Sequence, residues 1–127
     1  MKILGIGVDI VENKRIQKSI KNHLFKNRIY SSNELKQSNA VNNKVAYFSK
    51  RFAAKEAFSK ALGTGISKEI NFNQIVILNE KNGKPFIRLI EKTKKNVEKK
   101  LKKKNYKISL SLTDEDEYAV AFVAISI

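Results

Sequence analysis

Two acidic residues and one lysine are the side chains in this sequence best suited to chemistry. Asp9 follows Gly5 and Gly7 at alternating positions, and Glu56 and Lys60 stand four residues apart in an alanine-rich segment. A pair of carboxylates suits Mg²⁺, which usually takes few protein ligands and completes its coordination with water and substrate phosphates. A lysine one helical turn after a glutamate either pairs with that carboxylate or binds a phosphate oxygen. From spacing alone, the simple Glu–Lys pair is the commoner arrangement.

The composition excludes several other kinds of catalytic and metal-binding site. The chain has no Cys, which excludes disulfides, iron–sulfur clusters, zinc–thiolate sites and thiol nucleophiles. Its one histidine, His23, lies in a basic polar stretch, so a His-based triad and a multi-His metal cage are excluded as well. Any metal in this protein is therefore expected to be a hard ion held by oxygen ligands.

Size and charge point to one basic domain. The 127 residues carry 26 Lys and Arg against 12 Asp and Glu, for a net charge of +14. This length fits a single domain over residues 1–127, and the charge implies a polyanionic partner: nucleic acid, an acidic protein or a phosphate-rich substrate. The apolar N-terminal stretch reaches Asp9 and Glu12 before it attains signal-peptide or membrane-span length. We therefore expect a cytoplasmic protein without a membrane partner.

The elements expected to position the candidate residues are a strand and a long helix. Alternation over residues 2–11 predicts a strand with Asp9 on its glycine-bearing face. Alanines over residues 43–62 predict the strongest helix, ended by Gly63. Helical projection places Glu56 and Lys60, together with Ser49, on a narrow polar strip between two apolar sides. A helix of this kind is expected to be buried over most of its circumference.

The rest of the chain mixes short helices and strands. Expected helices are one over residues 12–28, a short one within 30–43, and a lysine-dominated one over 92–104; expected strands are 75–78, 86–89, 108–112 and 118–127. Asn82-Gly83-Lys84-Pro85 is typical of a hairpin turn. Because strands and helices do not alternate regularly, the predicted class is α+β, with a mainly antiparallel sheet packed on one long helix.

The predicted first helix carries a basic surface with an aromatic residue within it. Its members are Arg15, Lys18, Lys21, Phe25 and Arg28. Such a surface is either simply solvated or a docking site for an acidic protein or nucleic acid. The later lysine-rich helix over 92–104 lacks interleaved aromatic residues, so it gives little indication of single-strand stacking, and we expect an exposed face.

Read in order, several segments resemble one enzyme family. They are residues 5–11 followed by Arg15-Ile16, residues 51–65, the turn 82–85, and residues 109–113 with Tyr118-Ala119. Together they look like the holo-acyl-carrier-protein synthases, bacterial 4′-phosphopantetheinyl transferases of fatty-acid synthesis. The resemblance spans nearly the whole chain, and its most specific block is Arg51-Phe-Ala-Ala-Lys-Glu-Ala-Phe-Ser-Lys60.

The resemblance implies a reaction and a fold. Members of this family transfer phosphopantetheine from coenzyme A to a serine of an apo carrier protein, release adenosine 3′,5′-bisphosphate and require Mg²⁺. Matched by motif, Asp9 and Glu56 would hold the metal, and Lys60 would bind phosphate or assist proton transfer. The group that accepts the serine proton stays open among Glu56, Lys60 and a water molecule on the metal.

The resemblance also implies where the partners bind. Coenzyme A is expected near Arg51, Lys60, Gly63, Gly65, Lys84 and Pro85. Family members are homotrimers with active sites between subunits, which fits a last strand that is apolar on both faces. The basic first helix would then dock the strongly acidic acyl carrier protein. One departure is Ser109, where many relatives carry a histidine, so no role of that histidine transfers to this chain.

Two alternatives to this enzyme stay open at the level of sequence. The high charge is also compatible with a nucleic-acid-binding domain without catalysis, which would bind DNA with steep salt dependence and have no need of Glu56. A catalytically inactive carrier-binding relative is disfavoured because both carboxylates and Lys60 are present. An activity assay separates it from the transferase, for which no nucleic-acid partner is expected.

Overall fold

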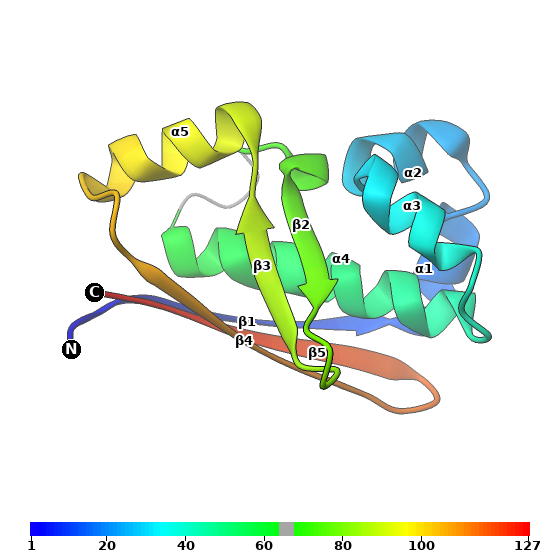
Figure 1. Ribbon diagram of the computed structural model, residues 1–127. Helices are drawn as coiled ribbons and strands as arrows, with labels where there is room; N and C mark the ends of the chain where they lie inside the picture. Colours follow the sequence, from blue (N-terminus) through cyan, green and yellow to red (C-terminus); the bar gives the residue numbers. More distant parts are fainter. Residues whose placement is uncertain (64–67) are drawn as a thin grey trace.

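In the computed structural model, which describes residues 1–63 and 68–127, two antiparallel sheets lie against one long helix (Figure 1). The elements in chain order are β1 (Ile3–Glu12), α1 (Asn13–Ser19), α2 (His23–Ile29), α3 (Ser32–Ser38), α4 (Lys44–Leu62), the 3-10 helix η1 (Phe72–Gln74), β2 (Ile75–Asn79), β3 (Pro85–Leu89), α5 (Glu91–Leu101), β4 (Lys107–Asp114) and β5 (Tyr118–Ser126). The predicted α+β class and the antiparallel strand pairing are confirmed.

The larger sheet has the strand order β1-β5-β4, with β5 in the centre. Its registers place Asp9 opposite Ala121, and Val8 opposite Phe122. Alternate residues therefore face α4 or the far side of the sheet. The far side, here called the outer face, carries exposed apolar side chains: Ile6, Val8, Ile10 and Phe122.

The glycine-bearing face of β1 packs directly on α4. A β-carbon built on Gly7 would lie 2.0 Å from the carbonyl oxygen of Ala57, and one on Gly5 would lie 1.9 Å from that of Ala61. Both positions are far inside van der Waals contact, so only glycine permits this approach of strand and helix. The group that approaches the glycines closely is the backbone of α4.

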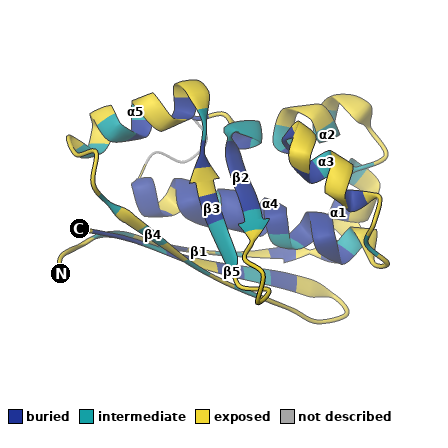
Figure 2. Ribbon diagram, in the orientation of Figure 1, coloured by how far each residue is buried: buried dark blue, intermediate teal, exposed yellow. Residues whose placement is uncertain are grey.

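Helix α4 is the centre of the hydrophobic core. Most of its residues are buried, as Figure 2 shows by the dark colour along its length. It lies between the large sheet and the β2–β3 hairpin (Figure 1). The Asn43 side chain caps its first turn by accepting a hydrogen bond from the backbone N–H of Ala46, and Gly63 ends it in the left-handed conformation with φ 83°. The predicted bounds, burial and glycine stop are thus confirmed.

The helix predicted over residues 12–28 is two helices, α1 and α2. The break falls at Asn22, whose side-chain oxygen accepts hydrogen bonds from the backbone N–H groups of Leu24 and Phe25 and so starts a new helix. The lysine-rich helix α5 ends at Leu101, because Lys102 adopts a left-handed conformation with φ 56°. Within the described parts of the chain, no helix is long and apolar enough to cross a bilayer.

Candidate functional site

Asp9 and Lys60 meet where β1 lies on α4. The Lys60 Nζ atom is 3.1 Å from Asp9 Oδ1 and 3.0 Å from the carbonyl oxygen of Val8. The Asp9 side chain is 15% exposed and that of Lys60 is 52% exposed. Asp9 is therefore largely screened from solvent, whereas the lysine lies at the surface and is free to exchange Asp9 for another anion.

Glu56 lies beside this pair, one helical turn before Lys60. Partial burial raises the pKa of the Glu56 carboxyl, and the negative charge of Asp9 raises it further. Lys60 and Arg15 oppose that shift with their positive charges. The strand and the helix thus bring two carboxylates close enough to repel each other, an arrangement that a bound cation would relieve.

The donor set fits Mg²⁺. Within residues 1–63 and 68–127, no three His, Cys, Asp or Glu side chains gather in a metal cluster. A metal ion held by Asp9 and Glu56 alone would have most of its coordination positions left for water and for a ligand. Mg²⁺ is commonly held in this way beside substrate phosphates, and oxygen ligands on two rigid elements suit its strict geometry. Zinc and copper prefer sites with nitrogen or sulfur ligands, which Asp9 and Glu56 do not supply.

A cavity of about 640 Å³ opens next to Glu56. One wall comes from α1 and α2, through Arg15, Phe25 and Arg28, and the opposite wall is residues 70–74. Phe25 packs on Phe52 of α4 with ring centroids 6.1 Å apart, and the Arg15 guanidinium lies 5.4 Å from the centroid of the Phe52 ring. We call this space the docking cavity. It combines an apolar floor with basic groups and ends at a carboxylate.

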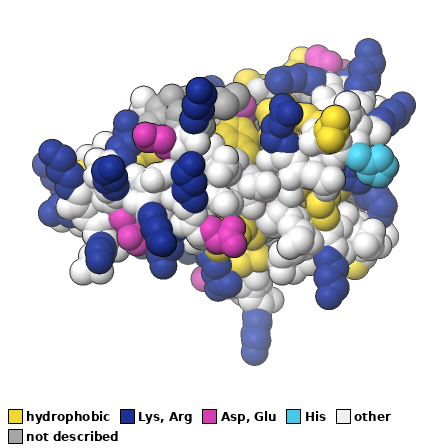
Figure 3. Space-filling view, turned by 90° about the horizontal axis from the view of Figure 1, so that it is seen from above, with side chains coloured by type: hydrophobic (Ala, Val, Ile, Leu, Met, Phe, Trp, Pro, Cys, Tyr) yellow, Lys and Arg dark blue, Asp and Glu magenta, His cyan; other side chains and the backbone are white. Residues whose placement is uncertain are grey.

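The predicted docking residues divide into two groups. Arg15, Phe25 and Arg28 line the docking cavity, whereas Lys18 and Lys21 are exposed outside its lining. Seen from above, Lys and Arg side chains gather toward both ends of this side of the molecule (Figure 3). The structure therefore places the predicted basic surface next to Glu56.

The predicted coenzyme A ligands do not all come together. Arg51 is buried; its guanidinium stacks 3.6 Å from the Tyr47 ring centroid and donates to Asn79 Oδ1 at 3.1 Å. Asn79 in turn donates to the carbonyl oxygen of Gly83 at 3.0 Å, which links Arg51 to the turn that bears Lys84 and Pro85. These residues form a second group, here called the hairpin group.

The hairpin group and Lys60 lie on opposite sides of α4. Arg51 and Lys60 are nine residues apart, which corresponds to a rotation of about 180° around the helix axis. One ligand molecule cannot reach both residues of the same chain without wrapping around the helix. The coenzyme A residues predicted here would thus serve a single ligand only if two chains contributed them.

Four other residues considered in the sequence remain to be described. Gly63 caps α4 one turn after Lys60, and Gly65 lies outside the described residues. Ser109 is exposed on β4 opposite Ala124, on the outer face. Ser49, from the predicted polar strip, is fully buried, so the strip is accessible only at its Glu56 and Lys60 end.

Sequence reasoning missed a buried ion pair between Lys55 and Glu34, whose Nζ and Oε1 atoms are 2.7 Å apart. The predicted helix start near Ser32 came close to Glu34, because the Ser31 and Glu34 side chains form a capping box at the beginning of α3. The pairing joins residues far apart in sequence, and no local pattern announces it. Residues 70–74, which form a wall of the docking cavity, carried no recognised signal either.

Comparison with known proteins gives one consistent family. The 4′-phosphopantetheinyl transferase superfamily matches residues 5–123. A holo-acyl-carrier-protein synthase of Pelagibacter ubique is 51% identical over 98% of this chain and 98% of its own. The crystal structure of the Neisseria meningitidis holo-acyl-carrier-protein synthase has a TM-score of 0.90 at 38% identity, covering 99% of this chain and 100% of that one. That of Bacillus anthracis, in complex with CoA (3′,5′-ADP), has a TM-score of 0.81 at 35% identity, covering 98% and 96%.

Proposed function

Because the chain belongs to the 4′-phosphopantetheinyl transferase superfamily, we propose that it moves 4′-phosphopantetheine from coenzyme A to a serine of an apo acyl carrier protein, with Mg²⁺. The resemblance seen in the sequence is thereby confirmed at the level of the family. Relatives named holo-acyl-carrier-protein synthase, one solved with coenzyme A, support both substrates. The observation that carries the proposal is the pair of carboxylates, Asp9 and Glu56, of which Glu56 lines a basic and apolar docking cavity.

In the proposed reaction, the serine hydroxyl oxygen attacks the phosphorus atom next to pantetheine. The bond from that phosphorus to the bridging oxygen of the pyrophosphate breaks, and adenosine 3′,5′-bisphosphate leaves with that oxygen. Asp9 and Glu56 would hold Mg²⁺, which supplies charge neutralisation for the pyrophosphate. The exposed ammonium of Lys60 then moves from Asp9 to a phosphate oxygen, where it adds a charge-assisted hydrogen bond.

Glu56 is our proposed acceptor for the serine proton. Its carboxyl lies at the end of the docking cavity, where the serine of a docked carrier would arrive. In the metal-free chain, burial and the charge of Asp9 raise the pKa of this carboxyl. Lys60, whose side chain forms an ion pair with Asp9, is the poorer candidate in this arrangement.

The carrier protein is proposed to dock on α1 and α2. Arg15 and Arg28 would pair with its carboxylates, and Phe25 would contact an apolar side chain near the serine. Lys18 and Lys21, outside the cavity, would steer the acidic partner at longer range. The nucleophile belongs to the partner, so this chain needs no activated serine or cysteine of its own.

We further propose that the active enzyme is a homotrimer with sites between subunits. The outer face exposes Ile6, Val8, Ile10 and Phe122 at 62%, 55%, 63% and 45%, a continuous apolar surface that association would cover. A shallow hollow on this face is lined by Phe122 and Lys60 together, so the face borders the candidate site. A neighbouring subunit could then supply its hairpin group to the coenzyme A bound at Lys60.

A role in fatty-acid synthesis and a cytoplasmic location stay predictions. The alternative of a non-catalytic nucleic-acid-binding domain is not supported, because the match to an enzyme family extends over residues 5–123. The high positive charge has a sufficient partner in an acidic carrier protein and in the phosphates of coenzyme A.

Mass spectrometry of an apo acyl carrier protein, incubated with this chain, coenzyme A and Mg²⁺, tests the proposal. We expect the carrier to gain the mass of one phosphopantetheine, and to gain none when EDTA is present. The Glu56→Gln variant is the matched control for contaminating transferase. A folded wild-type chain that modifies no carrier protein, or one that is equally active in EDTA, would contradict the proposed reaction or its metal dependence, respectively.

A further inference from the structure

The Lys55–Glu34 ion pair is buried completely in the subunit. Both side chains have 0% exposure, and the Nζ–Oε1 distance is 2.7 Å. Burying two charges costs several kcal/mol, and a well-packed apolar pair in the same space is often as stable. The pair is therefore poorly explained by stability alone, and its position directly before Glu56 raises the question of what it holds in place.

The hydrogen bonds of the pair join three parts of the chain. Besides Glu34, the Lys55 ammonium donates to the carbonyl oxygen of Phe72 at 2.8 Å and to that of Ile75. The Glu34 carboxylate accepts from the backbone N–H of Ile77 at 3.0 Å and from that of Ser31 at 2.9 Å. All three donors of the ammonium are used, so the pair fixes α3, α4 and the η1–β2 segment relative to one another.

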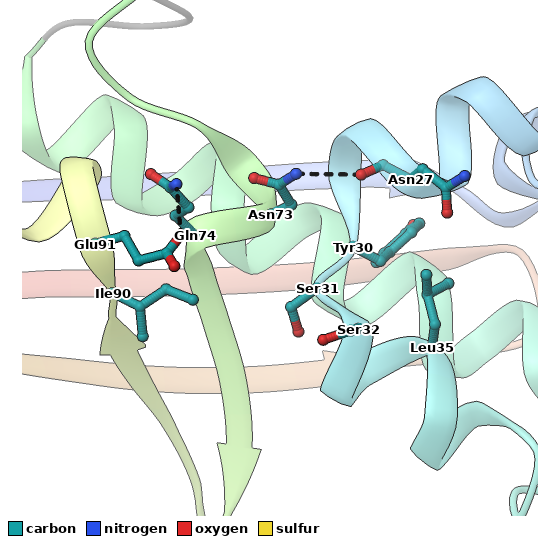
Figure 4. A pocket seen from close by; sticks show the side chains of 9 residues that line it. All are labelled: Asn27, Tyr30, Ser31, Ser32, Leu35, Asn73, Gln74, Ile90 and Glu91. Atoms are coloured by element: carbon teal, nitrogen blue, oxygen red, sulfur yellow. Dashed lines mark hydrogen bonds between the residues drawn. The ribbon is translucent and has the colours of Figure 1, made fainter.

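The segment held by Lys55 is a wall of the docking cavity. Phe72 begins η1 and Ile75 directly follows it, and residues 70–74 line the cavity together with Glu56. From η1 the connection continues to α2, because Asn73 Nδ2 donates to the carbonyl oxygen of Asn27 at 3.2 Å (Figure 4). The two walls of the cavity are thus tied to each other and, through Lys55, to the helix that carries Glu56.

We propose that Lys55 and Glu34 are positioning residues, which keep the 70–74 wall at a fixed distance from Glu56 so that the docking cavity is preformed for the carrier protein. This inference rests on the proposed function. Directional hydrogen bonds from one ammonium to two carbonyl groups set the wall's position, whereas an apolar contact would allow it to slide. A preformed cavity lowers the ordering cost of docking, so its loss should weaken carrier binding more than coenzyme A binding.

The double variant Glu34→Gln with Lys55→Met tests this role. It removes both charges, keeps similar side-chain volumes and leaves no unpaired buried charge. We expect the KM for the carrier protein to rise by about tenfold or more, while the dissociation constant of coenzyme A with Mg²⁺, measured by calorimetry, changes by less than about twofold. An unchanged KM for the carrier, or an equal loss of coenzyme A affinity, would overturn the inference.

Val97→Ala is the matched control for lost stability. Val97 is a fully buried residue of α5 that does not line the docking cavity, and its truncation lowers the free energy of unfolding while every hydrogen bond of the Lys55–Glu34 pair is kept. At an assay temperature where both variants are folded, we expect its KM for the carrier to equal that of the wild type. A KM raised as much as in the double variant would assign the effect to general destabilisation and overturn the inference.

If the double variant does not fold, the Asn73→Ala variant tests whether the position of the 70–74 wall affects carrier binding. It removes only the side-chain bond from η1 to Asn27 at the cavity's edge, and we expect a several-fold rise in the KM for the carrier with intact coenzyme A binding. No rise would overturn the inference in that case. Failure of the proposed function is distinguishable, because the wild-type chain would then modify no carrier protein at all.

Discussion

A β-carbon on Gly7 would lie 2.0 Å from the carbonyl oxygen of Ala57, so β1 and α4 touch backbone to backbone. This contact fixes the height of the strand above the helix two residues before Asp9 and one residue after Glu56. The spacing of the two carboxylates therefore depends on a residue that has no side chain. Because the obstructing atom belongs to helix backbone, no rotamer change can make room for a methyl group.

The Gly7→Ala substitution should therefore disrupt both fold and site. We expect the free energy of unfolding to fall by about 3 kcal/mol or more, because strand and helix must separate to admit the methyl group. Chemical denaturation followed by circular dichroism measures this loss. Gly83→Ala is the comparison: Gly83 has φ 90° with nothing near its missing β-carbon, so only backbone strain of about 1 kcal/mol is expected. Equal losses at both glycines would contradict the close-packing explanation.

The local elements were predictable because their signals are short-range. Alternation in β1, alanine content and Gly63 in α4, and the turn at residues 82–85 each depend on neighbours in sequence, and all are confirmed. Asn22 shows the limit: one capping side chain outweighed the continuous apolar spacing and divided the first helix. The sequence signal for this break was the capping residue Asn22, which lies inside a segment with continuous helical spacing of apolar residues.

The site was predictable in its residue types and only partly in its arrangement. Motif and resemblance selected Asp9, Glu56 and Lys60, and the fold brings them together. The docking cavity could not be derived, because its 70–74 wall is held by the Lys55–Glu34 pair across 21 residues of sequence. By contrast, the helical projection that groups Glu56 with Lys60 also places Arg51, nine residues before Lys60, on the opposite side of α4.

The Glu56→Gln substitution should abolish transfer and yet stabilise the metal-free fold. Burial and the Asp9 charge disfavour the ionised carboxyl, so an uncharged amide of the same shape removes that cost. We expect a melting temperature in EDTA a few degrees above that of the wild type, with activity lowered by at least about 100-fold. Thermal unfolding scans with and without Mg²⁺ and coenzyme A check the explanation.

In these scans, Mg²⁺ should raise the melting temperature of the wild type more than that of the Glu56→Gln variant. An equal rise in both proteins would place the metal elsewhere.

The pKa of Glu56 also predicts how metal use depends on pH. Metal binding requires the carboxylate, and the raised pKa means that this group takes up a proton at a higher pH than an ordinary glutamate. The half-saturating Mg²⁺ concentration should therefore rise as the pH falls. Below the pKa of Glu56, the rise should be up to about tenfold per pH unit. Activity titrated with Mg²⁺ at several pH values measures it. A half-saturating concentration that stays constant down to the ordinary glutamate range would refute the assignment.

The positions of the basic residues, rather than the net charge of the chain, should determine how strongly they affect the KM for the carrier protein. The Lys18→Gln/Arg28→Gln double variant removes two charges from the docking surface on α1 and α2, and the Lys95→Gln/Lys99→Gln variant removes the same charge from exposed positions on α5. We expect the first to raise the KM for the carrier about five- to tenfold and to flatten its salt dependence, because electrostatic steering acts at the docking surface. The second should leave both unchanged within about twofold. Steady-state kinetics over a range of NaCl concentrations distinguishes them, and equal effects would mean that carrier recognition follows net charge.

The outer face gives a test of assembly whose main readout is the oligomeric state, because Phe122 shares a hollow with Lys60 and a change there also reaches the candidate site. Phe122 lies opposite Val8 at the middle of this face and is 45% exposed in the subunit, so an aspartate there is tolerated by the isolated fold but not by an apolar interface. We expect Phe122→Asp to convert a trimer into a monomer in light scattering, with unchanged circular dichroism, and to lower activity by at least about tenfold because Lys60 loses the neighbouring hairpin group. Lys103→Asp, which places the same carboxylate on the exposed residues after α5, should remain trimeric and active. A monomeric Phe122→Asp variant with full activity would show that one chain binds coenzyme A by itself, and a trimeric one would move the interface to another surface.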